Sequence, residues 1–72
     1  MNTYIAYDKD TFQILGFISN DYTTIEEAKD IFQSFENYNV ISTNMRIPDF
    51  FENYKLEIEN GVLKEIKEMG VE

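Results

Sequence analysis

Carboxylates are the main candidates for acid–base chemistry or metal binding in this sequence, because its 72 residues include neither histidine nor cysteine. Histidine is the commonest general base and transition-metal ligand, and thiolates hold structural zinc. One group of acids, Asp8-Lys9-Asp10, resembles the start of a calcium-binding loop. The glycine and the distal glutamate that such loops use are missing, so we interpret this group as an ordinary turn.

A second group consists of Glu26, Glu27 and Asp30, and a pair of acids can act as general acid and general base. That chemistry needs a desolvated cleft that separates the two pKa values, whereas these residues fall on the polar face of a predicted helix. The serines and threonines lack a histidine to activate them, and no lysine lies in a nucleophile motif. We therefore expect a binding protein rather than an enzyme, with no cofactor and no metal.

The helix that carries these acids is predicted over residues 24–36. Thr24 and Glu27 form a capping box, in which each side chain accepts a hydrogen bond from the other residue's backbone amide. Apolar side chains recur every three or four residues, at Ile25, Ala28, Ile31, Phe32 and Phe35. This stripe predicts packing on a sheet. Asn37 and Asn39 end the helix, since short amides tolerate left-handed backbone.

Two β-rich segments, Thr3–Tyr7 and Phe12–Ile18, enclose Asp8-Lys9-Asp10-Thr11 and predict an antiparallel hairpin. The loop is interpreted as a type I turn in which the Asp8 carboxylate accepts hydrogen bonds from backbone amides ahead of it. Gly16 indicates a bulge, or a close approach of another backbone, because glycine weakens an ordinary strand.

A four-residue loop places Tyr7 opposite Phe12 and Ile5 opposite Ile14. Both faces of the hairpin are then apolar, which is unusual for an antiparallel hairpin with one solvated side. One face carries Ile5, Tyr7, Phe12, Ile14 and Ile18, and the other carries Tyr4, Ala6, Leu15 and Phe17.

A third strand is predicted at Tyr38–Thr43, and Asn44–Asn53 is a connector. Pro48 suits the first position of a short helical turn. We expect Phe50 and Phe51 to fold the connector back onto the body, since two adjacent exposed phenylalanines make a poor solvent surface.

One helix covers one face of a sheet, so the first hairpin has an apolar face to spare. We expect Tyr4, Leu15 and Phe17 to form a self-association surface and the protein to be a homo-oligomer, because two-fold dimers commonly cover such surfaces. The alternative is that the Phe50-Phe51 connector covers this face.

A second hairpin is predicted where Tyr54–Glu59 and Val62–Lys67 flank Asn60-Gly61, a strong turn signal. A competing pattern exists, because Val62, Ile66 and Met69 also fit a short helix ended by Gly70. We favour strand over helix for residues 62–69.

Two registers are open to this hairpin. A two-residue loop sets Leu56 opposite Glu65, whereas a three-residue loop with left-handed Gly61 sets Ile58 opposite Val62. We prefer the second, because burial decides register. It gathers the apolar residues on one face, namely Tyr54, Leu56, Ile58, Val62 and Ile66.

These elements predict an α+β fold in the order ββαβββ, with one antiparallel sheet and the helix packed on a face. A chain of 72 residues makes a single domain, which spans residues 1–72. No run of about twenty apolar residues is present to span a membrane, and Met1–Tyr4 leads into a strand pattern without a signal peptide. We therefore expect a cytoplasmic protein.

Fourteen acidic residues against six basic ones give a net charge of −8. Such a chain repels nucleic-acid phosphates and associates readily with basic protein surfaces. The candidate partner-binding face consists of the acids around the helix, Glu26, Glu27, Asp30 and Glu36. The alternative interpretation is that the charge only maintains solubility.

Three segments, taken together, resemble parts of known proteins, and they read YIAYDKDTFQILGFI, IPDFF and YKLEIENGVLKEI. They resemble short proteins from bacteriophages and prophages of Gram-positive hosts, several of which lie near tail and baseplate genes. The resemblance implies a phage-encoded, non-enzymatic role in the host cytoplasm. We expect an inhibitor that occupies the basic surface of a host protein, such as a defence nuclease. The alternative is a structural component of a phage tail or baseplate.

Overall fold

The computed structural model describes residues 2–69 and confirms the α+β class and the order ββαβββ. Within these residues lie five strands, one α-helix and one short 3₁₀-helix, η1. Their bounds are β1 Asn2–Asp8, β2 Ile14–Asn20, α1 Ile25–Ile31, β3 Tyr38–Thr43, η1 Phe51–Asn53, β4 Tyr54–Glu59 and β5 Val62–Glu68.

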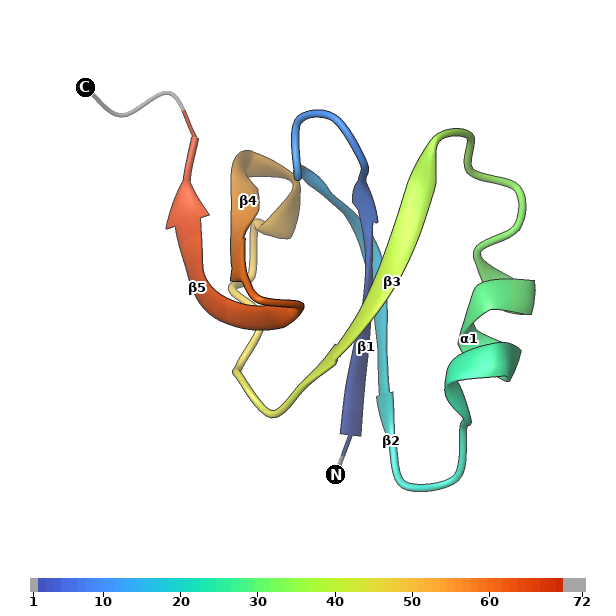
Figure 1. The fold of residues 1–72 in the computed structure, drawn as a ribbon. Coiled ribbons are helices and arrows are strands. Elements are labelled where there is room, and N and C mark those ends of the chain that lie inside the picture. The colour runs from blue at the N-terminus through green and yellow to red at the C-terminus, as the bar shows by residue number, and fades with distance from the viewer. Residues whose placement is uncertain (1, 70–72) are drawn as a thin grey trace.

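The strands form two antiparallel sheets, so the prediction of one sheet is wrong. One sheet has the order β2-β1-β3, and the other is the hairpin β4-β5. The helix α1 lies on one side of the three-stranded sheet and the β4-β5 hairpin lies on the other (Figure 1). The second hairpin forms a separate sheet because both faces of the first hairpin are apolar, and each face has to be covered by another element.

The central strand β1 contributes to two hydrophobic cores, because successive side chains of a strand point to opposite faces. Tyr4 and Ala6 face the helix, and Ile5 and Tyr7 face the second hairpin. The first core consists of Tyr4, Ala6, Ala28, Phe32 and Val40. The second core consists of Ile5, Tyr7, Ile14, Leu56 and Leu63.

A β-bulge in β2 sets the register of the first hairpin. Tyr7 pairs with Ile14, but the preceding residue Ala6 pairs with Gly16, so Leu15 is the extra residue. The bulge expected at Gly16 is confirmed. A Cβ atom on Gly16 would lie 3.2 Å from Cε1 of Phe32, so what approaches closely there is an aromatic ring rather than a backbone.

The bulge exchanges the faces of the residues that follow it. Ile5 pairs with Phe17, not with Ile14 as predicted, and Tyr4 pairs with Ile18. Phe17 therefore joins the face of the second core, and Ile18 packs against the first core. Counting alternate positions along β2 gave the wrong faces because an inserted residue reverses the alternation.

Phe12 lies in the loop before β2 and is not a strand partner of Tyr7, which corrects the predicted pairing. Its φ angle of 63° is left-handed, an outlier for a bulky residue. The backbone amide of Phe12 donates to the Asp8 carbonyl, and its own carbonyl accepts from the Leu56 amide at 2.8 Å. The strained residue therefore joins the first hairpin to β4, and its ring stacks on Tyr7.

The helix α1 is shorter than predicted and covers only Ile25–Ile31. The capping box of Thr24 and Glu27 is confirmed by both hydrogen bonds. Phe32 caps the C-terminus with non-helical dihedral angles. Ile31 is consequently 58% exposed instead of belonging to the apolar stripe.

Packing beyond the helix explains its early end. The Phe32 and Phe35 rings stack on each other and cover Gly16. The carbonyl of Lys29, in the last turn of the helix, accepts from the Tyr38 hydroxyl at 2.9 Å. Asn37, a predicted stop residue, is left-handed with φ of 50° and turns the chain into β3.

The second hairpin is a strand pair, as preferred over a helix, but its preferred register is wrong. Asn60 and Gly61 have φ angles of 55° and 78°, and Glu59 pairs with Val62 across a two-residue turn. Two left-handed residues are what a type I′ turn requires. Val62, assigned to the buried face, is 66% exposed.

A second bulge then corrects the pairing that counted against this turn. The register shifts beside Glu57, so that Lys64 is the extra residue of β5. Leu56 consequently pairs with Ile66 instead of Glu65. The extra residue Lys64 lets the hairpin keep the two-residue turn at Asn60-Gly61 and still pair Leu56 with Ile66 on the buried face.

The connector between β3 and β4 folds back with one of its two phenylalanines. Phe51 packs against the second core and meets the Phe17 ring edge-on, with 5.5 Å between ring centroids. Phe50 remains 69% exposed. The helical turn begins at Phe51 rather than at Pro48.

Gly16→Ala tests the close approach of β2 and the helix segment. The new methyl would meet the buried Phe32 ring, so we expect the free energy of unfolding to fall by about 1–3 kcal/mol. Urea denaturation measures this difference.

The double variant Gly16→Ala/Phe32→Leu is the control, because leucine removes the ring edge. Relative to Phe32→Leu alone, the alanine should then cost much less. An unchanged cost would show that the contact with Phe32 does not require glycine.

Candidate functional site

The predicted partner-binding acids lie in α1 and in the segment that follows it, and we call residues 21–36 together the α1 layer. Helix α1 lies at one side of the molecule (Figure 1). Glu26, Glu27, Asp30 and Glu36 are all exposed. Residues 21–36 hold five acids and one lysine, a local charge of −4 out of the total −8. Within residues 2–69 no ion pair involves any of these four carboxylates. Glu27 is the member with a structural task, since its carboxylate accepts from the N-cap amide.

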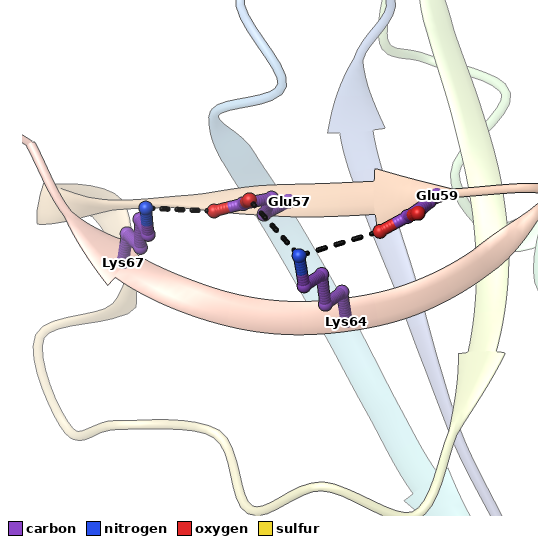
Figure 2. A network of polar contacts seen from close by, with 4 residues as sticks. All are labelled: Glu57, Glu59, Lys64 and Lys67. Carbon is purple, nitrogen blue, oxygen red and sulfur yellow. Dashed lines mark ion pairs between the residues drawn. The ribbon is translucent and has the colours of Figure 1, made fainter.

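The second hairpin carries its charges differently, because two of its lysines form ion pairs with two of its acids. Lys64 Nζ lies 3.3 Å from Glu59 Oε2 and 4.0 Å from Glu57 Oε1, and Lys67 Nζ lies 2.8 Å from Glu57 Oε2. Figure 2 shows these four side chains bridging β4 and β5. Half of the formal net charge of −8 lies in residues 21–36, outside this hairpin.

The Asp8 loop is a turn, as interpreted from the sequence. The Asp8 carboxylate accepts from the amides of Thr11 at 3.0 Å and Asp10 at 2.8 Å, and these bonds lower the pKa of Asp8. Asp10 Oδ2 accepts from the Asn37 side-chain amide. Among residues 2–69 no group of three or more acids could hold a metal ion.

The expected self-association surface is not one surface. Tyr4 is buried in the first core, and Leu15 is half-buried against the same core. Phe17 is 39% exposed on the opposite face, beside Phe51. The bulge in β2 places Phe17 on the opposite face from Tyr4 and Leu15, so the prediction that the three share one exposed face is wrong. The homo-oligomer itself stays a prediction.

A groove that the sequence reasoning missed lies at the open end of the second hairpin. It has a volume of about 400 Å³, and it is lined by Phe50, Asn53, Tyr54, Glu68 and Met69. Tyr54 and Glu68 meet there because they are strand partners. The preferred register paired Tyr54 with Ile66, and the rejected two-residue turn without a bulge would pair it with Lys67, so the pairing of Tyr54 with Glu68 needs the bulge at Lys64.

The sequence matches no protein-family model, and no curated protein and no solved structure matches it. Residues 2–69 contain no helix that is long and apolar enough to cross a membrane.

The ion pairs of the second hairpin predict a pH dependence. The hydrogen bond and charge of Lys67 hold the pKa of Glu57 below its usual 4.5, and Glu57 raises the pKa of Lys67 above 10.5. The stabilisation from Glu57 is therefore complete above about pH 4.5 and is lost as pH falls through the lowered pKa. The stabilisation from Lys67 is complete below about pH 10.5 and is lost as pH rises through the raised pKa of Lys67.

Carboxyl carbon shifts recorded by NMR during an acid titration measure this directly. Lys67→Gln should return the pKa of Glu57 towards its usual value, and Lys64→Gln should move it less. Equal effects of the two substitutions would show that the short Lys67–Glu57 bond is not the main cause.

Proposed function

We propose that this protein is a phage-encoded, non-enzymatic binding protein that inhibits a host protein by occupying a basic surface. One observation supports the proposal most: the chain segregates its charge. Residues 21–36 hold a local charge of −4 with no ion pair for Glu26, Glu27, Asp30 or Glu36 among residues 2–69, whereas in the second hairpin Glu57 and Glu59 are paired with Lys64 and Lys67.

The inhibition follows from electrostatics and rigidity. Exposed carboxylates on a small folded body can occupy the positions of nucleic-acid phosphates in a basic groove, such as that of a defence nuclease. Complementary charge accelerates association and disfavours acidic competitors. The short helix holds Glu26 and Asp30 four residues apart, which places them on one face. The first core holds the helix against the sheet.

A second candidate, a structural part of a phage tail or baseplate, is favoured by the edges of the three-stranded sheet. Both β2 and β3 are edge strands, and such edges can pair with another chain. Phe17 adds an exposed aromatic surface on β2. An assembly role would also be consistent with the predicted homo-oligomer.

Neutralising the α1 face tests the inhibitor proposal. Glu26→Gln/Glu27→Gln/Asp30→Asn should slow association with the partner, which is isolated from host lysate, by about tenfold at low salt. The fold should persist, because glutamine also serves in a capping box. Raising the salt concentration should narrow the gap, since exposed charges are screened beyond ~10 Å at 0.1 M. Surface plasmon resonance gives both rates.

A charge-matched control separates this face from net charge. Asp49→Asn/Glu52→Gln/Glu65→Gln also removes three acids, but none on α1. We expect this control to bind nearly as fast as the unchanged protein. Equal slowing by both triple variants would mean that the α1 face is not the binding surface.

A further inference from the structure

The groove at the end of the second hairpin combines apolar walls with one carboxylate. Its floor is the strand pair of Tyr54 and Glu68. Beyond this pair, the backbone amide of Met69 donates a hydrogen bond to the Asn53 carbonyl at 2.8 Å. Phe50, which is largely exposed, completes the lining. The volume of about 400 Å³ is sufficient for a large side chain or a small ligand.

The position of Glu68 is the unusual feature. Tyr54, Leu56 and Ile66 all pack against the second core, so they lie on the inner face of the hairpin. Glu68 is the partner of Tyr54 and two residues from Ile66, so it lies on this inner face as well. Glu68 is exposed, so its carboxylate is accessible to a partner at the end of this apolar face.

No cation of residues 2–69 pairs with Glu68. Two lysines of the hairpin, Lys64 and Lys67, are bound to Glu57 and Glu59 on its outer face. The contact found for Glu68 is with the Tyr54 hydroxyl, at 3.5 Å from Glu68 Oε2, which is long for a hydrogen bond. Among the described residues the groove therefore presents a carboxylate without a cation, and its lining also includes the aromatic residues Phe50 and Tyr54.

We propose that this groove binds an arginine side chain of a protein partner. The guanidinium would pair with the Glu68 carboxylate, and its flat face would lie on the ring of Phe50 or Tyr54. The aliphatic stem would lie along Met69. Arginine fits better than lysine, because its planar group stacks on aromatic rings, pairs with carboxylates in a fork, and is weakly hydrated. The overall charge of −8 favours such a cationic guest.

This surface goes beyond the proposed function. The second hairpin and α1 lie on opposite sides of the three-stranded sheet (Figure 1). A flat partner surface that faces the α1 acids does not reach the groove. The arginine site is therefore a separate contact, and its test needs no partner protein.

An arginine probe and its neutral isostere test the site. N-acetylarginine amide is titrated into the protein labelled with ¹³C at methionine methyls and ¹⁵N at amides, and N-acetylcitrulline amide is the matched control. We expect the arginine probe to shift the Met69 methyl and the Asn53 signals with a millimolar dissociation constant. Citrulline should bind at least about threefold more weakly, because it lacks the charge.

Two protein variants locate the charge that matters. Glu68→Gln should weaken the arginine probe at least about threefold, whereas Glu65→Gln removes the same charge from the same hairpin and should leave binding unchanged. Phe50→Leu should weaken arginine more than citrulline, because the π face is lost. Amide spectra show that each variant is folded.

The opposite results would overturn the proposal. These are no shift at Met69 with arginine, equal binding of citrulline, or equal weakening by Glu65→Gln and Glu68→Gln. None of them bears on the α1 acids, and failure of the α1 triple variant leaves the arginine result standing.

Discussion

Burial of the central strand on both faces is the constraint on which the rest of this structure depends. Ile5 and Ala6 are adjacent in β1 and fully buried, one in each core. A strand of this kind cannot be satisfied by one helix, because half of its apolar side chains would face water. The second hairpin has to leave the sheet and cover the other face, which gives three layers in a chain of 72 residues.

Local chemistry in the sequence was sufficient to predict several elements. The capping box of Thr24 and Glu27 and the strand at Tyr38–Thr43 depend on residues close in sequence, and the structure has both. The apolar character of both faces of the first hairpin was also evident. What it implied, a cover on each side, was instead interpreted as a surface for self-association.

The two bulges are the reason why the predicted strand registers and faces failed. Gly16 indicated the first bulge, but its effect on the pairing of the following residues depends on packing between segments distant in sequence. At Gly16 the bulge moves Phe17 from the expected face to the opposite one. At Lys64 it allows the Asn60-Gly61 turn and the pairing of Leu56 to coexist. The groove at Glu68 depends on the pairing of Tyr54 with Glu68, which the bulge at Lys64 produces, and this is why it could not be located from the sequence.

The same layered arrangement separates the charges. The extra residue of the second bulge, Lys64, lies between Glu57 and Glu59 and forms an ion pair with each (Figure 2). No comparable lysine serves the acids of α1 within residues 2–69. The layer opposite the hairpin is therefore the acidic one, held in place by the first core, and both proposed surfaces depend on layers that share β1.

Native-state hydrogen exchange tests most directly whether the three layers form one unit through β1. Because both cores include β1, we predict that the amides of β1 and β4 exchange by the same unfolding event. They should show equal free energies and equal dependence on denaturant. If the β4 amides exchange at a clearly lower free energy than those of β1, the second hairpin opens by itself. The claim that β1 needs both covers would then be contradicted.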